Sequence, residues 1–321
     1  MLIYIDGTDR TGKTRLARRL ARRTRATVIH RGPPTGPTLL HHGAHLAAYR
    51  PGDRWILDRN HWSDLAYGPL YHPEERLGEL GAFYLDLALE ARGAVVVLGR
   101  TATPEEAAAR VRRLGDDYLR EEDAAAVWAA FEAAADGTLL PVWQHDFQEE
   151  PVDEDALLET ARARAAEAAP ALTLAPEAVG FTSLPSHLLV GDRVEGSAQW
   201  RLEFPLPFAP FLGSSGHYLW ENLAGTVEAG RARPLVVNAR DSADAPVDLA
   251  ALWETLGRPP TVALGNHAQA ALAAAGVRHG VVPHPQFVRR FKYRHGVVYA
   301  TALLRAAEHE GDLRAWLTSL T

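Results

Sequence analysis

The chain has 321 residues and a formal net charge of −6, and 47% of its residues are apolar while 23% are charged. These values are ordinary for a globular protein long enough for two domains, and they exclude a protein that is strongly basic overall, as many nucleic-acid binders are. The absence of cysteine excludes disulfides and thiolate zinc sites. No apolar run approaches the roughly 18 residues of a membrane span, and no signal-peptide pattern opens the sequence, so we expect a cytoplasmic protein without a membrane segment.

The first expected element is a strand that leads into a glycine-rich turn. Leu2 to Ile5 form a short apolar run, as in a buried parallel strand, and from Lys13 onward apolar residues recur at helical spacing. Between them "GTDRTGKT" fits the pattern GxxxxGK[ST]. A strand before this pattern and a helix after it predict a phosphate-binding loop, in which glycines let backbone N–H groups curl toward a phosphate at the helix N-terminus.

This loop predicts ATP and Mg²⁺ as cofactors. Lys13 is expected to reach the β and γ phosphates as a catalytic residue, and the Thr14 hydroxyl to hold magnesium. The chain has only two lysines, Lys13 and Lys292, so a sequence that otherwise uses arginine places a compact point charge at the position where such a loop needs one. The residues expected to bind ATP are Gly7, Thr8, Asp9, Arg10, Thr11, Gly12, Lys13 and Thr14.

Further strands are expected at residues 26–30, 55–58, 94–98 and, less clearly, 143–147, with helical patterns between them. Such alternation predicts an α/β fold: a parallel sheet with helices on both faces. Ligands in these sheets bind at the carboxyl ends of the strands. The segments "HRGPPTGP" from His30 and "DRNHW" from Asp58 follow two of the strands and are therefore candidate site segments.

The phosphate-binding loop, the proline-rich turn after Arg31 and the Asp58-Arg59 pair, in this order, resemble thymidylate kinase and its deoxynucleoside kinase relatives over about the first 165 residues. The resemblance implies a nucleotide kinase, often dimeric, in which Arg31 and Arg59 bind the acceptor's phosphate. Asp58 would be catalytic, orienting an acceptor hydroxyl or holding magnesium through water. The segment "TATPEEAAARVRRLGDDYL" is similar to the family's lid over the ATP phosphates, and its lid candidates are Arg110, Arg112 and Arg113. The residues that the resemblance implies to be catalytic are Lys13, Asp58, Arg59, Arg110 and Arg113.

The chain is expected to divide near residue 168. The stretch "PALTLAPEAVGFTSLPSH" contains three prolines, Pro170, Pro176 and Pro185, and little periodicity, which is typical of a linker. We therefore expect a kinase-like domain over residues 1–168, a linker over 169–186, and a second, smaller α/β domain over 187–321 that begins with the strand "HLLVGD".

The second domain resembles the uracil-DNA glycosylase superfamily. The motifs that carry this resemblance, in order, are "LLVGDRVEG", "PFLGSSGHYLWENL", "PLVVNA", "TVALGNHAQAAL" and "VPHPQFVRRF". It implies that Asp192 positions water, Phe211 stacks on a base, Asn238 reads a pyrimidine edge and His284 stabilises the departing base. The basic run "RRFKYRH" that follows is a candidate for DNA phosphate contact.

Several functions stay open at this point. The leading hypothesis is ATP-dependent phosphoryl transfer to a deoxypyrimidine nucleotide, coupled to a domain that recognises a base. One alternative is a kinase of hydroxymethylated pyrimidine in phage-type modified DNA. The others are a uracil-type DNA glycosylase with an accessory phosphate-loop domain, and a nucleotide sensor without turnover. The pairing of Asp58 and Arg59 favours turnover, because a pure ATP sensor needs no grip on an acceptor.

Overall fold

A computed structural model of the chain describes residues 1–30, 42, 46, 48–73, 77–115, 118–146, 152–192, 214–241, 243–285, 288 and 296–306. The chain forms two compact units: unit 1 is Met1–His45 with Pro51–Glu167, and unit 2 is Leu46–Arg50 with Ala168–Thr321. In the described part of the chain, no helix combines the length and the apolar character needed to cross a membrane.

Unit 1 contains a five-stranded sheet of order β2-β3-β1-β4-β5, in which every neighbouring pair is parallel. The strands are β1 Leu2–Gly7, β2 Thr27–His30, β3 Trp55–Asp58, β4 Val95–Gly99 and β5 Val142–His145. All five expected strands are present, within a few residues of their expected bounds, so the predicted parallel α/β fold is confirmed for this unit.

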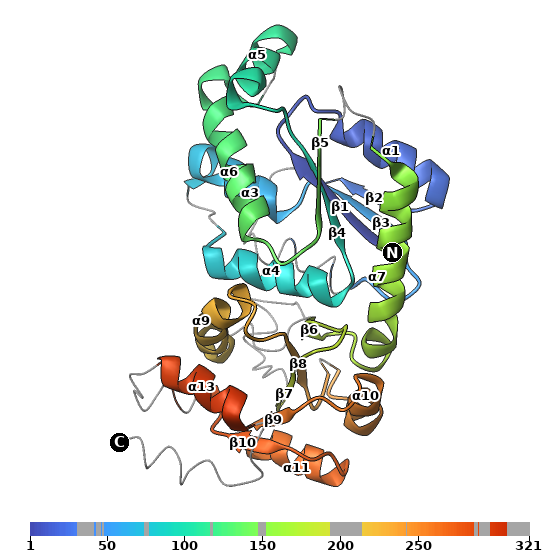
Figure 1. Ribbon diagram of the computed structural model, residues 1–321, viewed down its shortest axis with the longest axis vertical. Helices are drawn as coiled ribbons and strands as arrows, with labels where there is room; N and C mark the ends of the chain where they lie inside the picture. The colour runs from blue at the N-terminus through green and yellow to red at the C-terminus, as the bar shows by residue number, and fades with distance from the viewer. Residues whose placement is uncertain are drawn as a thin grey trace. The chain divides into compact units, whose positions relative to one another are not determined.

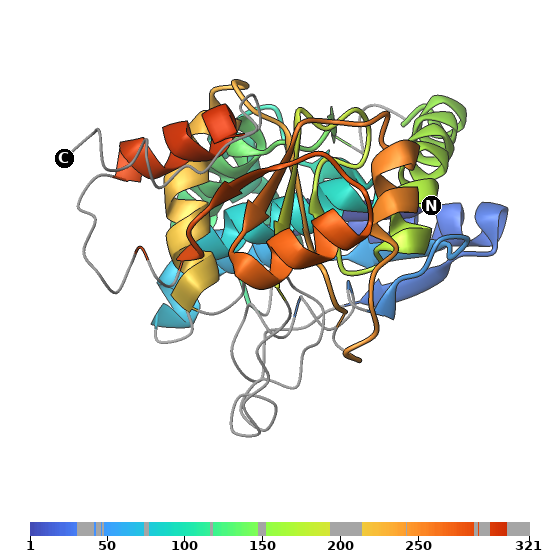
Figure 2. The ribbon, with the colours of Figure 1, turned by 90° about the horizontal axis from the view of Figure 1, so that it is seen from below.

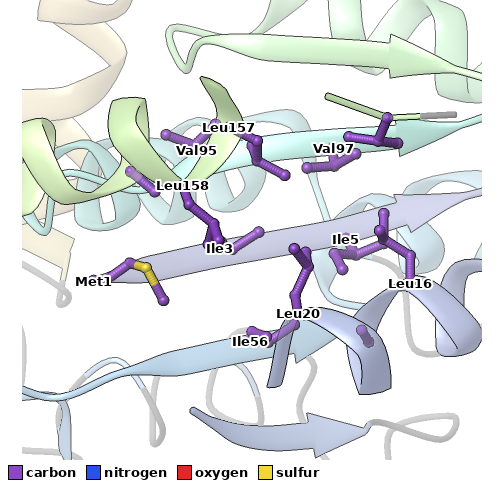
Figure 3. Packing of buried hydrophobic residues seen from close by; sticks show 13 residues of the cluster. Met1, Ile3, Ile5, Leu16, Leu20, Ile56, Val95, Val97, Leu157 and Leu158 are labelled. Carbon is purple, nitrogen blue, oxygen red and sulfur yellow. The ribbon is translucent and has the colours of Figure 1, made fainter. Parts of the chain in front are cut away.

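Helices cover both faces of this sheet (Figure 1). The helices are α1 Lys13–Thr24, α3 His61–Tyr71, α4 Glu79–Ala91, α5 Pro104–Leu114, α6 Ala124–Gly137 and α7 Glu154–Leu174, with a short 3-10 turn, η2, at Glu121–Asp123. On one face, leucines of α1 and α7 pack on β1, β3 and β4 around Ile3, Ile5, Ile56 and Val97 (Figure 3). This apolar contact fixes α1, and therefore the loop before it, against the carboxyl end of β1.

Unit 2 has its own five-stranded sheet, of order β10-β9-β7-β8-β6. Four strands, β7 His187–Gly191, β8 Pro234–Asn238, β9 Thr261–Leu264 and β10 Gly280–Val282, are parallel, and β6 Val179–Gly180 pairs with β8 in the antiparallel sense. Its helices are α9 Ser214–Glu228, α10 Leu249–Thr255, α11 Asn266–Ala274 and α13 Gly296–Ala306. Figures 1 and 2 show α9 beside α13 and α10 beside α11.

The stretch expected as a linker, residues 169–186, differs from that expectation. Helix α7 continues through Pro170 to Leu174, and Val179–Gly180 forms strand β6. Gly180 has φ +116, and a Cβ there would lie 2.1 Å from the carbonyl oxygen of Pro234, so only glycine allows this close pairing with β8. Prolines signal breaks in local structure, but the pairing of a two-residue strand depends on a partner more than 50 residues away and leaves no periodic trace.

Candidate functional site

The phosphate-loop pattern lies between β1 and α1, as expected from the sequence. Gly7 has φ +132 and pairs with Gly99 of β4, and a Cβ on it would lie 1.9 Å from the Gly99 carbonyl oxygen. Gly12 has φ +91 and immediately precedes α1, whose first turn contains Lys13 and the partly exposed Thr14. Both glycines thus occupy backbone conformations that other residues rarely adopt, and the loop lies at the helix N-terminus that anions favour.

Lys13 is buried in this loop. Its ammonium donates to the carbonyl oxygen of Thr8 at 2.6 Å and to Oδ1 of Asp9 at 3.4 Å. Burial lowers the pKa of Lys13, and the Asp9 charge acts in the opposite direction. The side chain is therefore held within the loop by oxygen partners, at the place where a phosphate group would supply stronger ones.

Asp9 joins the loop to the Asp58-Arg59 segment. The guanidinium of Arg59 pairs with the same Oδ1 that Lys13 contacts, and the hydroxyl of Tyr67, on α3, donates to Oδ2 at 2.9 Å. Burial acts to raise the pKa of Asp9, but the charges of Lys13 and Arg59 outweigh it and hold that pKa below its usual value. Asp9 was expected among the ATP ligands, whereas the structure directs it toward Arg59.

Asp58 is fully buried at the end of β3. Its Oδ2 lies 3.0 Å from Nδ1 of His30, the last residue of β2, and its Oδ1 has no hydrogen-bond partner among the described residues. No cluster of three or more metal-ligating side chains occurs in the described ranges. The unpartnered carboxylate oxygen and the Thr14 hydroxyl nevertheless fit Mg²⁺, which prefers oxygen ligands and is usually bound by one or two protein groups together with substrate phosphates.

The three lid candidates all lie on α5, and they differ in burial. Arg110 is buried and forms a double hydrogen bond with Asp146, at 3.2 and 2.8 Å, next to the end of β5. Arg112 pairs with Glu121 at the surface, and Arg113 is exposed. The guanidinium of Arg110 is therefore committed to a structural ion pair, and of the two residues predicted to be catalytic in this segment, Arg113 is the more accessible.

Two residues of this edge escaped the sequence analysis. His30 stood in a candidate segment, but its position at the carboxyl end of β2, beside Asp58, was not used to assign it a role. Tyr67 lies within a helix with an ordinary apolar pattern, and its contact with Asp9 joins positions 58 residues apart. The strand-end rule could have found His30, whereas no sequence signal marks Tyr67.

Some predicted residues lie outside the described residues. These are Arg31, Phe211 and the basic run at residues 289–295.

Three of the four residues of the predicted glycosylase-like pocket lie at the carboxyl edge of the second sheet. Asp192 follows β7, and its Oδ1 accepts a hydrogen bond of 2.8 Å from the backbone N–H of Ala268, in the first turn of α11. A Cβ on Gly265 would lie 3.3 Å from Cβ of His284 and 3.6 Å from both carboxylate oxygens of Asp192. Asn238 ends β8 opposite Gly191 in the sheet register.

The side chain of Asn238, at this edge, is buried and has an amide donor without a described partner. It is only 6% exposed, and its Nδ2 has no hydrogen-bond partner within the described ranges. A buried amide donor without a partner costs free energy, so a ligand group that accepted a hydrogen bond from it would recover that free energy.

Comparison with known proteins gives likenesses for about half of the chain. Neither a protein-family model nor a curated protein sequence matches it. Among solved structures, the chain is similar to the YorR protein from Bacillus subtilis in complex with phosphorylated GDP, with 22% identity and a TM-score of 0.42 over 51% of this chain and 98% of that chain. It is also similar to deoxyadenosine kinase from M. mycoides with bound dATP, with 14% identity and a TM-score of 0.33 over 51% of this chain and 99% of that chain.

Proposed function

We propose that unit 1 is a kinase that transfers the γ-phosphoryl group of ATP to a deoxypyrimidine nucleotide. The observation that carries the proposal is the shared carboxylate: Lys13 and Arg59 both contact Oδ1 of Asp9. Phosphoryl transfer is catalysed mainly by positioning and charge neutralisation, so it needs one cation for the donor phosphates and another for the acceptor. Asp9 holds two such cations side by side.

Each of these residues has a distinct task in the proposed reaction. Lys13 binds the β and γ phosphates of ATP from within the loop, and Arg59 binds the acceptor's phosphate with its planar fork. Asp58, held by His30, orients the acceptor. Arg113 is the accessible lid candidate for neutralising charge on the transferring group. Thr14 and Asp58 are the residues that would hold Mg²⁺, and a bound Mg²⁺ would neutralise phosphate charge.

The first experiment is transfer of labelled γ-phosphate from ATP to a panel of deoxynucleoside monophosphates and nucleosides. Wild-type protein is compared with Lys13→Ala and with the matched control Arg18→Ala, an exposed residue of the same helix. We expect a labelled deoxypyrimidine product that falls by at least about 10²-fold in Lys13→Ala, as when a preorganised charge is lost, and is unchanged in the control. Transfer to no acceptor would refute the proposal.

The same panel includes DNA that contains hydroxymethyluracil. Labelling of this DNA alone would favour the second acceptor class, a hydroxymethylated pyrimidine. The role proposed for Asp58, orienting an acceptor, suits this class equally well, because a hydroxymethylated pyrimidine also offers a hydroxyl as acceptor.

A second function is proposed for unit 2: recognition of a pyrimidine base, with glycosidic cleavage as its catalytic form. The buried amide of Asn238 supports it, because its Nδ2 has no partner among the described residues and an amide matches the donors and acceptors of a pyrimidine edge. Asp192 and His284 lie at the carboxyl edge of the same sheet. The basic run at residues 289–295 is the proposed DNA contact. Cytoplasmic location and a homodimer stay predictions from the sequence.

This second function is tested by calorimetric binding of free uracil and by release of uracil from DNA. Asn238→Asp replaces the amide donor by an acceptor, so we expect it to weaken binding by about 10- to 100-fold, the value of one or two lost hydrogen bonds. Glu254→Gln, a surface change on α10, is the control. If wild-type and Asn238→Asp protein bound uracil equally well, Asn238 would not be a base-binding residue.

A further inference from the structure

Asp6, the residue before the phosphate loop, has a carboxylate that is fully buried and surrounded by donors. Oδ1 accepts from the backbone N–H of Gly7 at 2.9 Å and from the hydroxyl of Ser63 at 2.6 Å. Oδ2 accepts from the hydroxyl of Tyr4 at 2.8 Å and from the backbone N–H groups of Asn60 at 3.2 Å and Ser63 at 3.0 Å. Five donors thus converge on one side chain.

These donors come from two different segments of the site. Gly7 opens the phosphate loop that contains Lys13, whereas Asn60 and Ser63 form the N-terminus of α3, directly after Arg59. Asn60, the residue before the helix, makes no side-chain cap of its own. Asp6 therefore caps α3 from another strand, and in doing so ties the loop to the segment that follows β3.

The segment tied in this way has an unusual backbone. Arg59 has φ +71, in the left-handed region, and its N–H donates to the carbonyl oxygen of Ile5 at 3.0 Å. A non-glycine residue stays in that region only where its surroundings fix it. The N–H of Arg59 is bonded to Ile5, and the N–H of the next residue, Asn60, is bonded to Asp6. Two consecutive backbone hydrogen bonds therefore hold the strained residue in place.

We propose that Asp6 is a positioning residue that sets the spacing between Lys13 and Arg59, and hence between phosphoryl donor and acceptor. The inference rests on the phosphoryl transfer proposed above, in which the two cations bind the two substrates. Transfer requires donor and acceptor groups in line at close range, and an error of about 1 Å can cost about 10²-fold in rate. A carboxylate that contacts both segments through short bonds limits such errors.

The arrangement requires a carboxylate and not an amide. Both oxygens of Asp6 face backbone N–H groups, which can only donate: Gly7 on the Oδ1 side, and Asn60 and Ser63 on the Oδ2 side. In either orientation, the NH₂ group of an asparagine would face at least one of these donors. Asp6→Asn must therefore release either the phosphate loop or the N-terminus of α3.

Tyr4 gives the carboxylate a second layer of support. Its hydroxyl donates to Asp6 and accepts from the backbone N–H of Trp62 at 2.9 Å. Its ring stacks on His61, with centroids 5.6 Å apart. Tyr4→Phe therefore removes one donor from Asp6 and one acceptor from α3, while the aromatic packing is kept.

The test compares Asp6→Asn with Asp86→Asn. Asp86 is another buried carboxylate of unit 1, bonded to the side chain of His61 at 2.9 Å and to the Thr138 hydroxyl at 2.6 Å. It thus contacts the first turn of α3 through one side chain, but among the described residues it does not join that segment to the phosphate loop, as Asp6 does. Both substitutions replace a buried carboxylate by an amide. We expect Asp6→Asn to lower kcat about 10²-fold with the KM for ATP changed by less than about 3-fold, and Asp86→Asn to lower thermal stability with kcat retained.

Ser63→Ala and Tyr4→Phe each remove one donor to Asp6, and they serve if Asp6→Asn does not fold. We expect a loss of kcat of several-fold in each, again without a matching change in the KM for ATP. Equal kcat in the folded Asp6 variants and wild-type protein, or an equal loss in Asp86→Asn, would overturn the inference.

A structural readout separates this inference from the proposed function. Crystal structures of wild-type protein and of Asp6→Asn, or of Ser63→Ala in its place, give the distance between Nζ of Lys13 and Cζ of Arg59. We expect this distance to change or to become variable in the variant. If wild-type protein phosphorylates no acceptor, the proposed function fails, and an unchanged distance would still overturn the role of Asp6.

Discussion

The carboxyl edges of the parallel strands in the two sheets differ in which polar side chains are buried there and in how those side chains are partnered. In unit 1 the edge carries ions that neutralise one another: Lys13 and Arg59 converge on Asp9. In unit 2 the corresponding edge carries Asn238, a neutral amide whose buried donor has no partner in the described part of the chain. Two cations that are held beside a carboxylate suit a negatively charged ligand such as a phosphate, whereas a neutral amide suits a neutral polar ligand such as a base.

The backbone of the two edges differs as well, and the largest predicted effect probes this difference. Gly7→Ala places a Cβ 1.9 Å from a carbonyl oxygen of a paired strand, while Gly265→Ala places one 3.3 Å from a side-chain carbon. Because the backbone cannot yield, we expect Gly7→Ala to lower the free energy of unfolding of unit 1 by about 4 kcal/mol or more, and Gly265→Ala to cost about 1–2 kcal/mol. Chemical unfolding measures both.

Gly115→Ala and Gly276→Ala are the matched controls for these variants. Both glycines have positive φ, +67 and +68, with open space where a Cβ would be. They isolate the cost of the backbone conformation, about 1 kcal/mol, from the cost of the clash. If Gly7→Ala cost no more than Gly115→Ala, the close pairing of β1 with β4 at Gly7 would be incorrect.

A second prediction separates structural from accessible arginines on α5. Arg110→Ala removes the guanidinium that bonds to both carboxylate oxygens of Asp146 in a buried ion pair, so we expect unit 1 to lose about 3 kcal/mol of stability. Arg113→Ala should change stability by less than about 0.5 kcal/mol because the side chain is exposed. If Arg113 serves as a lid residue, its loss lowers kcat for phosphoryl transfer at unchanged stability. Loss of kcat in the Arg110 variant alone, measured where it is folded, would reverse this assignment.

The third prediction tests whether the two edges are chemically independent. Arg59→Ala should lower kcat/KM for the acceptor by about 10²-fold, which corresponds to about 2.7 kcal/mol. It should leave uracil binding by unit 2 unchanged, because the charge it removes belongs to the first edge. Arg59→Lys keeps the charge but not the planar fork, and we expect it to recover only part of the activity. An equal loss in both assays would contradict the separation of the two sites.

The smallest predicted effect is a pH dependence that belongs to unit 1. The pKa of Asp9 is lowered in the folded state, so its stabilising contribution is fully present above its unfolded-state pKa and is lost as pH falls through the folded-state value. We expect wild-type protein to be more stable than Asp9→Asn by about 1–2 kcal/mol at neutral pH. The difference should shrink toward zero in acid, below the usual range of an aspartate. A difference that grows on acidification would contradict the ion pairing of Asp9 with Lys13 and Arg59.

Local sequence determined much of unit 1. The strand, the glycines and the helix around Lys13 are encoded within about twenty consecutive residues, because apolar spacing and glycine placement act over a few residues. Asp58 and Arg59 lie at the carboxyl end of β3, where the strand-end rule expects site residues, and Asp192, Asn238 and His284, named from the resemblance of the second domain, lie along the carboxyl edge of the second sheet. Their positions could be predicted because the carboxyl ends of parallel strands must meet along one edge, whereas their roles stay predictions.

Only the tertiary structure decided which side chains became partners at that edge. The contact of Asp9 with Arg59 and Tyr67, the pairing of Arg110 with Asp146, and the five donors around Asp6 join residues that are mostly far apart in the chain. Strand β6, inside the expected linker, likewise depends on its contact with β8. Spacing in the sequence fixes which residues share a face of one helix or strand, whereas burial and hydrogen bonding between elements select the partners. That selection depends on the packing of the whole unit.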